Sequence, residues 1–180
     1  MNEFNAFDWA DASKAEQERR IRESQPDELN AVMRYYDWSK YPQTVIGWAS
    51  AQQGIELGAA LAAFFNGDPM RFNYVRKRDV PKEYAETVRL LDNIIQRINA
   101  GFYLPDPLFC KEKLVKLEKW MQYQIEDTRD HKQGRWVFQR QVLEPILGPQ
   151  VIGFDLELRE PEEVESQFSI RGLLKPLVGS

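Results

Sequence analysis

The residue types that most often carry out catalysis or bind metals are scarce in this chain of 180 residues. His131 is its single histidine and Cys110 its single cysteine, so one chain can form neither a disulfide nor a zinc site of histidines and thiolates. A Ser–His–Asp or Cys–His arrangement would have to use His131. That residue stands in the hydrophilic run DHKQG at 130–134, which is typical of a solvated loop. The sequence therefore predicts no catalytic residues, no metal site and no cofactor.

Carboxylates offer the one remaining catalytic arrangement. Asp68, Asp79 and Asp92 flank the predicted central helices, and the first two fall in one turn region. Each also has a structural interpretation, which we favour: Asp68 and Asp79 as helix caps and Asp92 as part of a solvated helix face. A calcium loop of the EF-hand type and a glycine-rich phosphate loop are both missing from the sequence.

The turn at 66–74 concentrates polar side chains between two apolar helical segments, where they would share any pocket that forms. Its candidate binding residues are Asn66, Asp68, Arg71, Asn73 and Tyr74. Trp38 and Tyr41 belong to an aromatic-rich stretch at 35–48 and are added to this set. Aromatic residues at such density line a core or contact a protein partner.

Composition narrows the classes of partner. A formal net charge of -4 and a pI near 5.2 count against nucleic-acid binding, and the basic triplet RKR at 76–78 is too small to reverse this. The longest apolar run, at 57–65, is too short to span a bilayer, and residues 1–20 lack the apolar core of a secretion signal. We therefore expect a cytoplasmic protein with neither nucleic-acid nor membrane partners.

Hydrophobic periodicity predicts a helical chain. Helices are expected at 14–23, 26–36, 43–65, 81–100, 107–127 and 136–147. Ser13 and Glu16 have capping-box spacing, and Gly101 provides a helix stop. A period-two pattern at 151–158 predicts one short strand.

The predicted fold class is all-α or nearly so: a single-domain helical bundle around a central apolar helix, with at most one short β segment near 151–158. We expect an N-terminal arm at 1–12, the helical domain at 13–149 and a C-terminal extension at 150–180 packed on it. Gly54, Gly58 and Ala62 are four residues apart within the predicted helix at 43–65. They predict close packing against a neighbouring core helix, with a homodimer seam as the alternative.

Five short segments carry a resemblance to known proteins. They are GWA at 47–49, FNGDP at 65–69, RFNY at 71–74, LDNI at 91–94 and RINAGFY at 97–103. Over about residues 41–106 the chain resembles a family of bacterial cytosolic proteins of unknown function. The resemblance implies a bacterial cytosolic helical domain and assigns no activity.

The leading functional hypothesis is a non-catalytic cytosolic protein-binding module, which acts as an adaptor, an inhibitor or an immunity-type partner. One alternative is a small carboxylate-dependent, Mg²⁺-assisted enzyme with its site at the 66–74 turn. A further alternative is a self-assembling structural subunit that associates through Gly54, Gly58 and Ala62.

Overall fold

The computed structural model describes residues 7–105 and 111–147. This part of the chain is all-α, which confirms the predicted fold class. Its α-helices are α1 (Lys14–Glu23), α2 (Pro26–Tyr35), α3 (Pro42–Ala49), α4 (Leu57–Asn66), α5 (Met70–Asn73), α6 (Ala85–Asn99), α7 (Lys111–Arg129) and α8 (Arg140–Leu147), with 3₁₀ helices at Lys77–Asp79 and Lys82–Tyr84. The strand predicted at 151–158, the extension at 150–180 and Cys110 lie outside the described residues.

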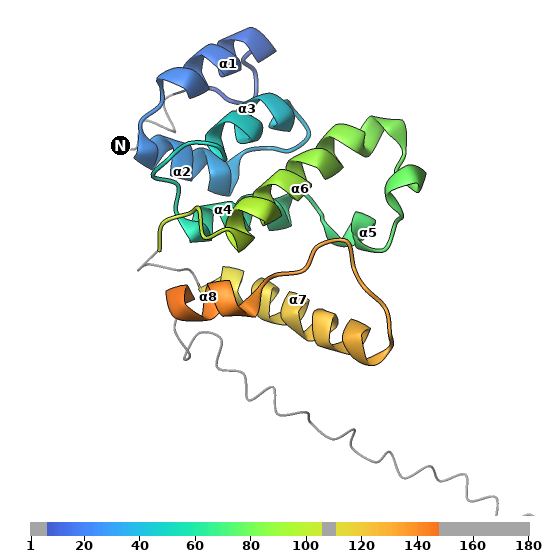
Figure 1. Cartoon of the computed structure of the whole chain (residues 1–180). Helices are drawn as coiled ribbons and strands as arrows, with labels where there is room; N and C mark the ends of the chain where they lie inside the picture. The colour runs from blue at the N-terminus through green and yellow to red at the C-terminus, as the bar shows by residue number, and fades with distance from the viewer. Residues whose placement is uncertain (1–6, 106–110, 148–180) are drawn as a thin grey trace, which may run out of the picture.

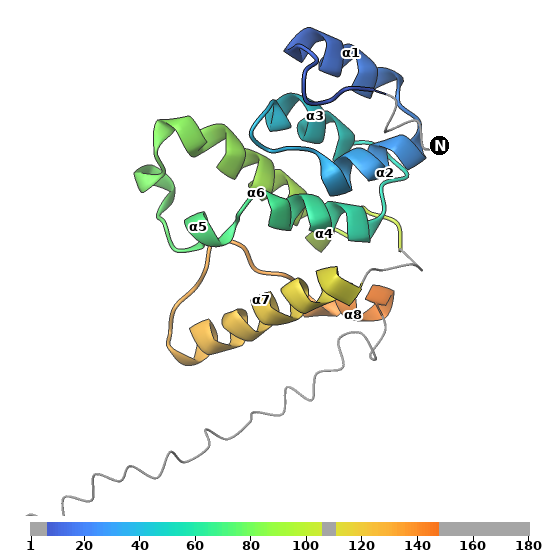
Figure 2. The same cartoon turned by 180° about the vertical axis from the view of Figure 1, so that it is seen from behind.

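The helices are arranged in three tiers (Figure 1). The first tier contains α1, α2 and α3, the second α4 and α6, and the third α7 and α8, as the view from behind also shows (Figure 2). The second tier contacts both of the others, since α4 packs against α2, α6 and α7. Every residue of α4 from Leu57 to Phe64 is buried, so the predicted central apolar helix is confirmed. No helix in the described ranges is both long and apolar enough to cross a membrane.

The single helix predicted at 43–65 is wrong, because the chain breaks into α3 and α4. Gly54 has a φ of +86°, a left-handed conformation that a helix interior does not allow. The break is held by Leu104, whose N–H donates to the Ile55 carbonyl and whose carbonyl accepts from the Leu57 N–H, both at 2.8 Å. Gly54 therefore lies outside the helix that contains Gly58, and the three small residues do not form one helical stripe.

Helix α1 begins with the predicted capping box, since Ser13 and Glu16 bond each other reciprocally. Its buried residues are Ile21 and Gln17. The Gln17 amide donates to the carbonyls of Trp9 (2.8 Å) and Ala12 (2.9 Å), and its oxygen accepts from the Tyr36 hydroxyl at 2.5 Å. A single buried amide thus joins the segment before α1 to the end of α2.

Helix α6 buries the predicted apolar stripe and ends before Gly101, whose φ of +66° makes it the predicted helix stop. The helix predicted at 136–147 is only partly correct, because α8 begins at Arg140. Residues 135–139, which we call the strap, connect the turn after α7 to α8. The chain rises from the end of α7 to α5 and returns to α8 (Figure 1).

Candidate functional site

The turn at 66–74 is shaped by close packing at Gly67. A Cβ at this position would lie 2.7 Å from the Trp38 ring and 2.8 Å from a Leu91 methyl group. Gly67 itself has an ordinary φ of -76°, and the following residue, Asp68, takes the positive φ of 50°. The predicted role of Asp68 as an N-cap is wrong: α5 has no side-chain cap, and Asp68 is exposed.

Two of the predicted site residues point away from the turn. The Asn66 amide donates to the Arg34 carbonyl at 2.9 Å and so ties α4 to α2. The Arg71 guanidinium lies 4.1 Å from the centre of the Tyr84 ring, a cation–π contact. Because these contacts lead in different directions, the structure does not bring Asn66 and Arg71 together in a pocket.

Trp38 and Tyr41 are partly buried against the domain. The Trp38 ring covers Gly67, and its indole nitrogen is buried without a hydrogen-bond partner. The Tyr41 N–H donates to the Tyr36 hydroxyl at 3.0 Å, just before α3 begins. In the structure both residues make packing and backbone contacts within the first and second tiers.

Asn73 is buried and holds the strap against α5. Its side-chain oxygen accepts from the Trp136 N–H at 3.2 Å, and its carbonyl accepts from the Arg135 N–H at 2.7 Å. Gly134 allows this approach, since a Cβ there would lie 2.4 Å from the Asn73 amide nitrogen. Asn73 thus connects two segments that are far apart in the sequence.

Two further side-chain amides form hydrogen bonds with the backbone of the strap, each donating one bond and accepting one, as a neighbouring strand would. Gln124 of α7 accepts from the Phe138 N–H at 2.8 Å and donates to the Phe138 carbonyl at 3.2 Å. Asn99 of α6 donates to the Val137 carbonyl at 2.8 Å and accepts from the Gln139 N–H at 2.9 Å. Side chains from two helices therefore satisfy polar backbone groups that a sheet would otherwise pair.

The aromatic side chains of the strap fix it in the core. Trp136 and Phe138 are buried, and both rings make edge contacts with Phe64 of α4. The Trp136 indole N–H donates to Asp92 at 2.6 Å. The sequence predicted that Asp92 is part of a solvated helix face. In the structure its carboxylate also accepts a hydrogen bond from a buried indole.

Two hollows lie along α7. The first, of about 340 Å³, is bounded by α7, α5 and the strap, and is lined by Asn73, Trp120, Tyr123, Gln124, Asp127, Thr128, Lys132, Gln133, Gly134, Trp136 and Val137. The second, of about 240 Å³, is lined by Phe65, Asp68, Pro69, Met70, Lys116, Lys119, Trp120 and Tyr123. Trp120 and Tyr123 line both hollows. We therefore treat the two hollows together and call them the groove.

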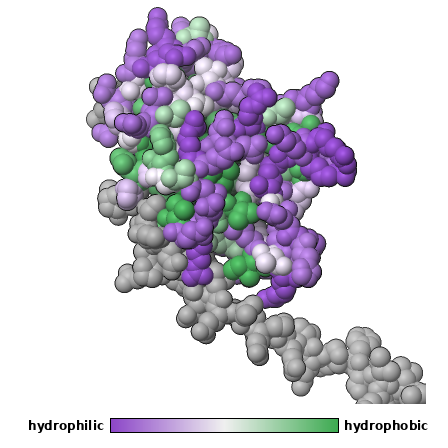
Figure 3. Space-filling model, in the orientation of Figure 1, coloured by the Kyte–Doolittle hydropathy of each residue, from purple (hydrophilic) through white to green (hydrophobic). Residues whose placement is uncertain are grey.

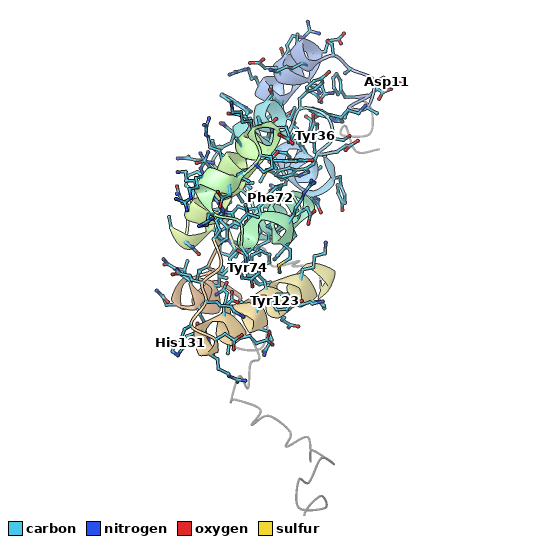
Figure 4. All side chains as sticks on the ribbon, turned by 90° about the vertical axis from the view of Figure 1, so that its right-hand side faces the viewer. Asp11, Tyr36, Phe72, Tyr74, Tyr123 and His131 are labelled. Carbon is cyan, nitrogen blue, oxygen red and sulfur yellow. The ribbon has the colours of Figure 1, made fainter. Side chains whose placement is uncertain are left out.

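Tyr74 bridges α5 and α7 beside the first hollow. Its hydroxyl donates to the Asp127 carboxylate, 3.0 and 3.1 Å from the two oxygens. Burial raises the pKa of the Tyr74 phenol, and the hydrogen bond and negative charge of Asp127 raise it further. The phenol therefore stays protonated and donating through the neutral range. Tyr74 and Tyr123 lie near each other at this junction, whereas His131 lies at the far end of α7 (Figure 4).

The groove includes only part of the predicted site. Asp68 and Asn73 line it and Tyr74 borders it, but its main wall comes from α7, which sequence reasoning did not select. A signal was present, because Lys116, Trp120, Tyr123 and Asp127 follow at steps of four, three and four, one face of a helix. Among residues 7–105 and 111–147, no group of three or more His, Cys, Asp or Glu side chains could hold a metal ion.

Comparisons with known proteins give no family for this chain: no family model matches it, and neither the curated proteins nor the solved structures contain a match. The resemblance to a bacterial cytosolic family over residues 41–106 therefore stays a prediction.

Proposed function

We propose that this protein is a non-catalytic binding protein that recognises a segment of another protein in the groove between α5 and α7. The observation that carries the proposal is the groove itself, with apolar and aromatic walls and exposed apolar side chains beside it. Met70 on α5 and Tyr74 directly after it are 38% and 52% exposed. Side chains such as these cover little of the core and are available to a partner.

The walls of the groove have the composition of a protein-binding surface. Trp120 and Tyr123 line both of its hollows, and Phe65 lines the second one. Interfaces are enriched in Tyr, Trp, Phe and Met, and their strongest contacts place one side chain in a preformed pocket. Lys116 and Lys119 supply a charged rim around the apolar walls.

The space-filling view shows apolar side chains exposed on this side of the molecule (Figure 3). The surface seen from this side is mostly hydrophilic, and apolar patches interrupt it chiefly in its lower half, at the level of α6 to α8 (Figure 3). With the predicted cytoplasmic location and the resemblance to bacterial cytosolic proteins, this supports an adaptor, an inhibitor or an immunity-type partner.

The proposal is tested by selecting random twelve-residue peptides, displayed on phage, on the immobilised full-length protein. We expect enriched peptides that lose at least tenfold in affinity on Met70→Glu, which places a charge beside the apolar walls. Leu104→Glu is the matched control, because Leu104 is 51% exposed and pairs with Ile55 and Leu57 at the other end of α4. Failure to enrich peptides, or equal binding to Met70→Glu, would contradict the proposal.

A further inference from the structure

The groove has opposite charges at its two ends. Lys116 and Lys119 are exposed and border the second hollow, whereas Asp127 borders the first. Lys116 and Asp127 are eleven residues apart on one helix, which corresponds to about 16 Å along its axis. Trp120 and Tyr123 lie between them; Trp120 is only 4% exposed, so the partly exposed Tyr123 forms the accessible middle of the groove.

The charge at the Asp127 end remains available to a ligand. Its carboxylate accepts from the Tyr74 hydroxyl, and a carboxylate has about four acceptor positions. Lys132 also lines this hollow, but its ammonium group is paired with Asp130 at 3.1 Å.

At the other end, two lysines face one carboxylate. The Lys119 ammonium lies 5.8 Å from the centre of the Tyr123 ring, and Asp68 lines the same hollow. Asp68 offsets one of the two positive charges, so this end retains a net charge of +1. It favours an acidic group of a ligand.

The distance between the charged ends of the groove fits a short extended ligand. An extended chain rises about 3.3 Å per residue, so the first and fifth residues of a segment lie about 13 Å apart, and their long charged side chains cover the rest of the 16 Å between the charged ends. Residues 1, 3 and 5 of such a segment point to the same side.

We propose that the partner presents an extended segment of five residues, with an acidic residue at position 1, an apolar residue at position 3 and a basic residue at position 5. The acidic side chain lies at Lys116 and Lys119, the apolar one against Tyr123, and the basic one at Asp127. This inference rests on the proposed function, because it names the kind of segment that the groove binds.

Synthetic peptides that differ only at their two charged positions test this arrangement on the full-length protein. The probes are acetylated and amidated peptides of the pattern Gly-Glu-Ser-Trp-Ser-Arg-Gly, with two companions that carry Glu or Arg at both charged positions. We expect the mixed-charge peptide to bind at least tenfold more tightly than either companion, as measured by NMR titration.

Charge reversal in the protein makes the test specific. We expect Asp127→Lys to shift the preference to the peptide with two Glu residues, and the double variant Lys116→Glu, Lys119→Glu to shift it to the peptide with two Arg residues. Glu86→Lys on α6 is the control, because Glu86 is exposed and paired only with Arg89. It should leave the order of affinities unchanged.

The outcomes separate this inference from the proposed function. If phage selection enriches peptides without this charge pattern, or if charge reversal leaves the order unchanged, the groove binds segments but the inference is wrong. If no peptide binds, and light scattering shows a dimer that Met70→Glu dissociates, a second copy of the chain occupies the groove. Both proposals are then wrong.

Discussion

Gly67 shows how one missing side chain shapes the region around the groove. The Trp38 ring and a Leu91 methyl group occupy the space where a Cβ would stand. The backbone of Gly67 is one that any residue adopts, so the requirement for glycine comes from packing and not from φ. This contact sets where α4 ends and therefore where α5 begins at Met70.

We expect Gly67→Ala to lower the free energy of unfolding by about 1–3 kcal/mol, the range typical of an overpacked core. Gly47→Ala is the matched control, because the nearest atom to its Cβ is 3.9 Å away and Gly47 lies inside α3. Alanine there should stabilise the protein by up to about 1 kcal/mol. Urea denaturation of both variants measures the difference, and equal stabilities would contradict this account of Gly67.

At the scale of elements, the strap is a strand-like segment in a helical protein. Asn99 and Gln124 each bond it in both directions, and Asn73 and Trp120 add one side-chain bond each. The third tier is thus attached to α5 and α6 by polar contacts, in addition to the rings that pack on Phe64.

Removing one of these amides should loosen the strap locally. We expect Gln124→Ala to cost about 1–3 kcal/mol, since it leaves the Phe138 N–H and carbonyl without their partner. Hydrogen exchange of the Phe138 amide should become faster, while amides in the middle of α6 keep their protection. Gln122→Ala is the control on the same helix, because Gln122 is exposed and bonds only Glu126. Unchanged exchange at Phe138 would show that Gln124 does not hold the strap.

At the scale of the whole molecule, Tyr103 connects the end of α3 to the segment after α6. Its hydroxyl donates to the Ser50 carbonyl at 3.0 Å in the interior. Burial raises the pKa of Tyr103 to about 12, partly offset by the nearby Arg97 guanidinium. A pKa raised in the folded state means that the contribution to stability is complete below pH 10 and is lost as the pH rises toward 12.

We expect the parent protein to lose about 1.4 kcal/mol from this group between pH 9 and pH 11. Tyr103→Phe should be less stable than the parent at pH 7, because the Ser50 carbonyl loses its donor, and its stability should fall less steeply above pH 10. Burial also raises the pKa of Tyr36, so the stability of the variant keeps a smaller dependence on pH. Denaturation at pH 7, 9, 10 and 11 measures both effects, and parallel slopes would contradict the prediction.

The helices were largely predictable because their signals are local. The capping box at Ser13, the apolar stripe of α6 and the stop at Gly101 depend on neighbours within a few residues. The break between α3 and α4 was not predictable in this way, since it depends on pairing with the distant Leu104. The strap was missed because the alternation of its buried and outward side chains covers only four residues.

The candidate site was predictable in residue type but not in arrangement. Asn73 and Tyr74 are polar residues of the expected turn, but their partners are Trp136 and Asp127, about 60 and 50 residues away. Such pairings come from the packing of α5 on α7, which no local pattern encodes. The helical spacing of this face of α7 was visible in the sequence. Only the position of α5 beside it shows that the face lines the groove.

The strap also constrains the order in which the protein folds. Its backbone bonds side chains of Asn73, Asn99 and Gln124, so α5, α6 and α7 must already lie near one another before these bonds can form. Contacts between such distant residues carry a high cost in loop closure and form late. We therefore expect the first and second tiers to form the folding nucleus. Substitutions in the strap should speed unfolding and leave the folding rate nearly unchanged.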